Sequence, residues 1–295
     1  MSTLNKLKFK LPRHVLEVIY KSFIRPLLEY ADIVWHGCTI SDSRRIERVQ
    51  YECSLTVSGA VRGSSYLSLL SELGWEKLSD RRHIHSLTMF HKIVHGHTRQ
   101  YLQELITPEV SASTPYDLRN KHNLQSPACT TTRYQRSFIP YATYHWNGLD
   151  IAVRSFNPSI FKNYLIKLVR PSPNTHFSQG PRYACVLLTR LRIGTCSLNF
   201  SLFTRNLVDS PSCSCGSRCE SVVHYLLYCP NYNQLRKTLL CNLQDLLTLD
   251  LKTTSDPVLT QLLLRGSPTL PTETNNHIMQ LTQTYILQTN RFQTD

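Results

Sequence analysis

Residues 79–96 carry a regular helical pattern and read Ser-Asp-Arg-Arg-His-Ile-His-Ser-Leu-Thr-Met-Phe-His-Lys-Ile-Val-His-Gly. Apolar side chains recur there every three or four positions, at Ile84, Leu87, Phe90, Ile93 and Val94. This spacing places them on one face of an α-helix. Gly96 is a natural stop because glycine readily adopts the left-handed conformation that ends helices. The stretch predicts an amphipathic helix, from about Ser79 to His95, whose apolar face packs against other elements.

Residues 12–35 show the same spacing on the N-terminal side. Their apolar positions are Val15, Ile19, Phe23, Leu27 and Tyr30. Proline lacks a backbone donor and clashes with the preceding turn. We therefore expect a kink or a break at Pro26.

Two further helices are expected before residue 79. The first should begin at Ser41, a plausible N-cap, and bury Ile46, Val49, Cys53 and Val57. The second should run from Ser65 to Gly74 and carry Leu67, Leu70 and Leu73. No convincing strand alternation occurs in residues 12–106, so this part predicts an all-helical unit.

The periodicity disappears between residues 107 and 136, among Pro, Ser, Thr and Asn. Helical patterns return in seven segments: 138–149, 157–169, 183–193, 198–207, 231–249, 257–265 and 273–292. The chain therefore predicts a mainly α fold. We expect a helical domain at 1–106, a basic linker at 107–136 and a second helical domain at 137–295.

The charge is strongly positive and unevenly distributed. The net charge is +13; residues 1–200 hold 26 Lys and Arg against 13 Asp and Glu, and residues 201–295 hold 7 against 7. A basic body with a neutral tail suits a polyanionic partner that touches only part of the molecule. No apolar run is long enough to span a bilayer and the N-terminus does not resemble a secretory signal. We expect an intracellular protein of the nucleus or cytoplasm.

Four of the ten cysteines crowd around His224 in residues 210–232, and the other six are scattered singly. One candidate ligand set is Cys213, Cys215, His224 and Cys229, spaced C-x-C-x8-H-x4-C. The other replaces Cys213 by Cys219, with spacing C-x3-C-x4-H-x4-C. Three thiolates and an imidazole complete a structural zinc tetrahedron. The alternatives are a metal-free packed cluster and a catalytic metal site.

One segment of the chain resembles the region after the polymerase palm in jockey-like and related LINE-type retrotransposon reverse transcriptases. It reads Leu11-Pro-Arg-His-Val-Leu-Glu-Val-Ile-Tyr-Lys-Ser-Phe-Ile-Arg-Pro-Leu-Leu-Glu-Tyr-Ala-Asp-Ile-Val-Trp35. The resemblance continues in order through residues 46–50, 73–82, 90–96, 116–120, 137–140, 146–147, 210–216 and 224–232. It covers nearly the whole chain.

The resemblance implies a thumb-like bundle at 1–106 and a C-terminal RNA-handling domain with a Cys-Cys-His-Cys knuckle. It favours Cys213, Cys215, His224 and Cys229 as zinc ligands and makes Cys219 the extra cysteine. The polymerase of this family needs paired carboxylates for two metal ions, and the chain contains no Asp-Asp. We therefore expect a truncated chain that is not an enzyme on its own.

The expected partners are RNA, RNA–DNA hybrid or DNA, together with the rest of a reverse transcriptase. Phosphate contacts need Lys and Arg outside the apolar faces, and the candidates are Lys21, Arg25, Arg44, Arg48, Arg81 and Arg82. In the linker, aromatic and basic side chains suited to single strands alternate: Tyr116, Arg119, Arg133, Tyr134 and Arg136. The three tryptophans, Trp35, Trp75 and Trp146, are expected in the core.

Three readings of the function follow. The first is a non-catalytic polymerase remnant that binds nucleic acid through phosphates. The second is an inert or structural helical remnant without independent binding. The third is an active reverse transcriptase, which would need carboxylates from another chain.

Overall fold

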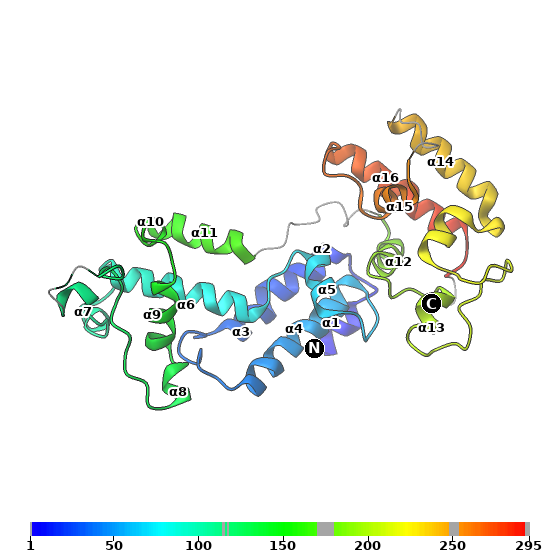
Figure 1. Cartoon of the computed structure of the whole chain (residues 1–295). Helices are drawn as coiled ribbons and strands as arrows, with labels where there is room; N and C mark the ends of the chain where they lie inside the picture. The colour runs from blue at the N-terminus through cyan, green and yellow to red at the C-terminus, as the bar shows by residue number, and fades with distance from the viewer. Residues whose placement is uncertain (1, 114–115, 117, 170–179, 248–253, 293–295) are drawn as a thin grey trace. The chain divides into compact units, whose positions relative to one another are not determined.

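The protein is described by a computed structural model covering residues 2–113, 116, 118–169, 180–247 and 254–292. Helices make up most of these residues, as Figure 1 shows. Among them β-pairing is limited to an isolated antiparallel bridge between Glu109 and Leu124. The predicted mainly α class is confirmed. No helix in this part of the chain is long and apolar enough to cross a membrane.

The N-terminal helical run is interrupted near Pro26, as predicted. Helices α1 (Ser2–Leu7) and α2 (Arg13–Ile19) are followed by the π-helix η1 (Tyr20–Ile24) and by α3 (Arg25–Glu29). Pro26 lies in the first turn of α3, where its missing donor costs no helical hydrogen bond.

The predicted apolar face of residues 12–35 is not buried throughout. Phe23, Leu27 and Tyr30 are 70%, 79% and 80% exposed. Val34, four residues further, is also exposed. The spacing correctly predicted helix as far as Glu29, but residues 30–37 form turns, and these four apolar side chains are exposed rather than packed.

The next two helices occur where the sequence predicted them, with two corrections. Helix α4 spans Ile40–Ser58, and its cap is Thr39 rather than Ser41, because the Thr39 hydroxyl accepts a hydrogen bond from the Asp42 amide at 3.1 Å. Helix α5 (Tyr66–Leu73) begins after Ser65 and ends at Gly74, as expected. Leu69 is fully buried there, whereas Leu67 is exposed.

Helix α6 (Leu78–Val94) follows the predicted pattern closely and packs against α9 (Phe138–Asn147) and α11 (Pro158–Val169). The core between them contains Ile84, Leu87, Phe90, Trp146, Phe161 and Leu165. Trp75 and Trp146 are buried as expected, and Trp35 is half-buried.

The predicted linker is better ordered than its composition suggested. It contains the short helices η2 (Val110–Ala112) and α8 (Thr132–Gln135), and α7 (Gln100–Gln103) lies just before it. The Asn147 side chain donates to the Leu124 carbonyl at 2.8 Å and accepts from its amide at 2.9 Å. Arg154, at the end of α10 (Ile151–Arg154), donates to the His122 carbonyl at 3.1 Å. Long-range polar contacts therefore replace the missing apolar periodicity.

The C-terminal helices are α12 (Arg182–Arg192), α13 (Asn199–Phe203), α14 (Asn233–Leu247), α15 (Asp256–Arg265) and α16 (Thr272–Gln288). Between α13 and α14 lie the π-helix η3 (His224–Tyr228) and the turn η4 (Pro230–Tyr232). Helix α16 contacts α12, α14 and α15. Its buried residues include Ile278, Tyr285 and Ile286, which belong to the largest apolar cluster.

The chain divides into two compact units. Unit 1 comprises Met1–Tyr20, Tyr51–Gly74 and Ser172–Asp295, and unit 2 comprises Lys21–Gln50 and Trp75–Pro171. These units combine distant segments and do not follow the expected ranges 1–106, 107–136 and 137–295. Whether those ranges fold by themselves stays a prediction.

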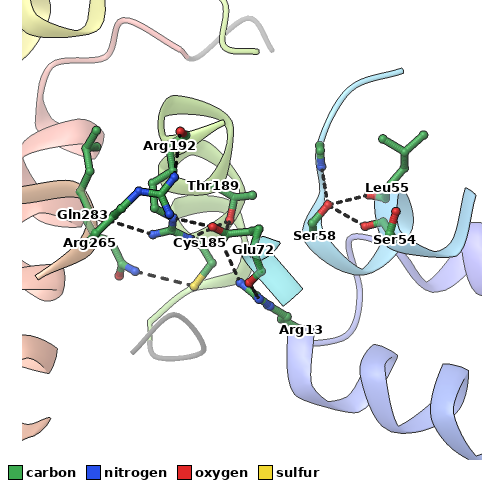
Figure 2. Close-up of polar contacts among 12 residues, drawn as sticks. Arg13, Ser54, Leu55, Ser58, Glu72, Cys185, Thr189, Arg192, Arg265 and Gln283 are labelled. Atoms are coloured by element: carbon green, nitrogen blue, oxygen red, sulfur yellow. Dashed lines mark hydrogen bonds and ion pairs between the residues drawn. The ribbon is translucent and has the colours of Figure 1, made fainter. Parts of the chain in front are cut away.

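A buried ion cluster joins the three segments of unit 1 (Figure 2). The Glu72 carboxylate accepts hydrogen bonds from Arg13 Nη1 at 3.1 Å and from Arg192 Nε at 3.1 Å. All three side chains are less than a tenth exposed. Burial raises the pKa of Glu72, but the charges of Arg192 and Arg13 outweigh it and bring the pKa below its ordinary value. The carboxylate is thus held ionised inside the protein.

Candidate functional site

Cys213 and Cys215 are positioned by a tight turn that requires glycine. Gly216 adopts φ = 92°, a conformation that L side chains rarely tolerate. Its amide donates to the Cys213 carbonyl at 3.0 Å, and the Cys213 amide donates to the Ser217 carbonyl at 2.9 Å. The turn brings both thiols to the same end of unit 1.

His224 and Cys229 are brought together by the π-helix η3. Cys229 follows its last residue, and the Cys229 amide donates to the His224 carbonyl at 2.7 Å. This five-residue hydrogen bond places residue 229 near residue 224, which an α-helical turn of 3.6 residues would not do.

The four predicted ligands of the first set meet. One ligand atom each from Cys213, Cys215, His224 and Cys229 lie within 4.8 Å of one another. Cys213 Sγ lies 3.8 Å from Cys229 Sγ, and Cys215 Sγ lies 3.4 Å from His224 Nε2. A zinc tetrahedron with Zn–S bonds of about 2.3 Å separates its sulfurs by roughly 3.8 Å. The donor set and its spacing therefore fit a metal ion, and this cluster could hold one.

Cys219 is not a member of this group. In the described part of the chain, the side chains that are close enough to share a metal ion are those of Cys213, Cys215, His224 and Cys229. Cys219 is half-buried two residues after Ser217, whose hydroxyl lies 3.5 Å from the Cys219 carbonyl. The geometry thus favours the C-x-C-x8-H-x4-C spacing over C-x3-C-x4-H-x4-C.

Buried charged side chains around the cluster hold it in place. Arg236 of α14 donates to the Leu226 carbonyl at 2.9 Å and to the Cys229 carbonyl at 2.6 Å. Glu220 accepts from Arg291 at 2.7 Å and from the Asn199 amide at 2.8 Å. These supporting residues were missed from the sequence. A signal existed for one of them, because Arg236 shares helical spacing with the buried Leu239 and Leu243.

Two thiols of the cluster have shifted pKa values. Burial raises the pKa of Cys229 to about 12. A hydrogen bond from the backbone of Ser217 is the main cause that lowers the pKa of Cys215. Cysteine binds metal as the thiolate, so metal uptake at this site would release protons.

The six basic candidates of the predicted thumb differ in their exposure and in their contacts. Arg44 and Arg48 are exposed on α4. Arg81 pairs with Glu29 and lies 3.6 Å from Glu76. Arg82 is buried, donates to Ser43 at 2.7 Å and lies over the Trp35 ring at 5.1 Å.

Lys21 and Arg25 are half-buried, and Arg25 lies 3.9 Å from Glu29. In the segment 116–136, the five predicted side chains are exposed: Tyr116, Arg119, Arg133, Tyr134 and Arg136. Their role in binding nucleic acid stays a prediction.

Asp32 is buried and lies 2.6 Å from His85 Nδ1. No protein-family model, curated protein or solved structure matches this chain.

Proposed function

We propose that the chain binds RNA, RNA–DNA hybrid or DNA through backbone phosphates, without catalysing a reaction on its own. The observation that supports this proposal is the exposure of five arginines in unit 2, accompanied by two tyrosines. The arginines are Arg44, Arg48, Arg119, Arg133 and Arg136, and the tyrosines are Tyr116 and Tyr134. Arginine recognises phosphate in any sequence, and tyrosine stacks on unpaired bases.

We further propose that Cys213, Cys215, His224 and Cys229 hold a structural zinc ion. These four side chains would fill all four coordination positions of the ion, which is typical of structural rather than catalytic zinc. The ion would supply a cross-link between the turn at Gly216 and the end of η3. The chain's own residues, Arg236 and Glu220 among them, orient the two ligand-bearing segments.

The resemblance to LINE-type reverse transcriptases supports an origin as the thumb and C-terminal part of such a polymerase, acting in the nucleus or cytoplasm. In this proposal the rest of a reverse transcriptase is a protein partner. The exposed apolar side chains of Phe23, Leu27 and Tyr30 support contact with a protein surface. The second candidate function is that of an inert helical remnant. It is favoured by the contacts that Arg81 and Arg82 make within the chain, to Glu29 and to Ser43, because these contacts occupy two of the candidate phosphate-binding side chains.

Charge reversal in α4 tests the binding proposal. We expect Arg44→Glu/Arg48→Glu to weaken binding of single-stranded RNA by about tenfold or more, because two phosphate contacts become repulsive. The slope of log affinity against log salt should fall by roughly 0.7 for each lost contact. Fluorescence anisotropy over a salt series measures both quantities.

The matched control is Arg218→Glu/Lys237→Glu, which makes the same change in net charge at exposed positions of the neutral C-terminal part. It should leave affinity within about twofold. Equal losses in both variants would show that binding follows net charge alone, and no binding by the wild type would favour the inert remnant.

The isolated chain should not extend a primer on an RNA template with magnesium or manganese. Nucleotide transfer needs two metal ions held by juxtaposed carboxylates, and the sequence lacks Asp-Asp. Incorporation of labelled nucleotide by the highly purified chain measures this. Extension that persists through purification and is abolished by Asp32→Asn would contradict the proposal.

A further inference from the structure

A cavity of about 380 Å³ lies within unit 1, and its lining includes neither the cysteine cluster nor the basic side chains that the sequence indicated. Its polar lining consists of Lys8, Glu52, Thr56, Arg62 and Arg190. These residues come from the segment after α1, the C-terminal half of α4, the turn that follows it and α12. The cavity therefore gathers cations that are far apart in the sequence.

Backbone carbonyls hold Arg190, which lines this cavity, and the neighbouring Arg182, whereas the Arg62 side chain is 85% exposed. Arg190 Nε donates to the Gly59 carbonyl at 3.1 Å. Behind the cavity wall, Arg182 donates to the Lys8 carbonyl at 3.1 Å and to the Thr56 carbonyl at 2.9 Å. These bonds fix the positions of the Arg190 and Arg182 guanidinium groups.

The carboxylate of Glu52 is the acidic group in the cavity lining, and it lies 3.9 Å from Arg62 Nη2. Three cations therefore face one anion. Burial lowers the pKa of the half-buried Lys8 ammonium, and the charges of three neighbouring arginines lower it further. They are Arg190, Arg182 and Arg62. The like charges repel one another, and an anion bound among them would relieve this repulsion.

We propose that this cavity binds a phosphate group through Lys8, Arg62 and Arg190. Guanidinium groups match the oxygen geometry of phosphate, and lysine adds a point charge. The phosphate is either a free anion or part of a nucleic-acid strand. The inference rests on the proposed function only if the phosphate belongs to a nucleic-acid strand.

The test uses the full-length chain and inorganic phosphate as the probe. Isothermal titration with sodium phosphate, compared with sodium chloride at equal ionic strength, should show saturable binding to the wild type. Lys8→Gln/Arg62→Gln should weaken it at least about tenfold, because charged hydrogen bonds to the anion are lost. The control Lys6→Gln/Lys10→Gln removes the same charge at exposed positions of the same region and should change affinity less than about twofold. Circular dichroism verifies folding, and single variants replace the double one if it is unfolded.

A second arm identifies the source of the phosphate. If Lys8→Gln/Arg62→Gln also weakens binding of a short RNA, and phosphate competes with that RNA, the cavity takes a strand. If RNA binding is unchanged while phosphate binding is lost, it takes a free anion. Arg44→Glu/Arg48→Glu should keep phosphate binding in the cavity. A failure of the proposed nucleic-acid binding can therefore be distinguished from a failure of the cavity site. Heats no larger than those of chloride, or equal affinities in the variant and its control, would overturn the site.

Discussion

Glu72→Gln should lower the free energy of unfolding of unit 1 by about 3–5 kcal/mol, because it removes the carboxylate from a buried ion cluster. Arg192 is fully buried at its side chain and Arg13 nearly so. Without the Glu72 carboxylate, these two guanidinium groups would lose the anion that they share in the interior. The loss exceeds what an exposed ion pair contributes, about 0–1 kcal/mol.

The measurement must report on unit 1. All three tryptophans, Trp35, Trp75 and Trp146, lie in unit 2, so tryptophan fluorescence does not follow the change. Hydrogen exchange of α12 amides against denaturant does. The control Glu273→Gln changes the same group at an exposed position of α16 and should cost less than about 1 kcal/mol.

Replacing all three charged residues distinguishes charge from packing. The triple variant Arg13→Met/Glu72→Met/Arg192→Met removes all three charges from the interior. It should recover much of the stability that is lost in Glu72→Gln. If Glu72→Gln and Glu273→Gln cost the same, the cluster does not stabilise unit 1.

Acid should weaken this unit in a defined direction. The pKa of Glu72 is below its ordinary value of 4.5, through Arg192 and Arg13, although burial acts the other way. The unfolded chain therefore binds the proton at a higher pH than the folded one. The stabilisation by Glu72 is complete above the unfolded pKa and is lost as the pH falls from there through the folded pKa.

Local patterns predicted the helices well and their packing less well. The spacing around Phe90 indicates both a helix and its buried face, because α6 meets other helices along that stripe. The spacing around Leu27 indicates a helix equally well, yet that face is exposed. Periodicity identifies an apolar face but contains no information about what, if anything, covers it.

Contacts between distant residues were beyond the reach of the sequence pattern. Arg82 follows Arg81 and was expected outside the apolar stripe, but it is buried and lies over the Trp35 ring. The ion cluster joins Glu72 to Arg13, which is 59 positions away in the sequence, and to Arg192, which is 120 positions away. A single sequence shows such pairs only as isolated charges.

At the candidate metal site, the sequence indicated the residues but left the choice between Cys213 and Cys219 open. Both spacings satisfy the donor chemistry of zinc. The choice depends on the turn at Gly216 and on the π-helical turn from His224 to Cys229, which spacing alone does not predict. Both ligand sets could be proposed from the sequence, and the geometry favours the set that contains Cys213.

The purified chain should contain about one zinc ion, and its loss should unfold the region around η3 and α14. A four-ligand structural zinc contributes folding free energy directly, up to roughly 10–16 kcal/mol in small zinc-binding peptides. In this chain we expect a smaller loss, of several kcal/mol, because Tyr225, Leu226 and Leu243 also bury apolar surface there. Elemental analysis and thermal unfolding with and without a chelator measure both effects.

Single substitutions then separate the two registers. His224→Ala and Cys229→Ser should abolish zinc binding under either register. Cys213→Ser should do the same, whereas Cys219→Ser should retain the ion, since its thiol is not among the four atoms that lie within 4.8 Å of one another. A reversed result for Cys213 and Cys219 would place the other register in the folded protein. Metal-free protein with intact thiols and the same unfolding temperature in chelator would mean that the cluster is packed without metal, as small buried thiols can be.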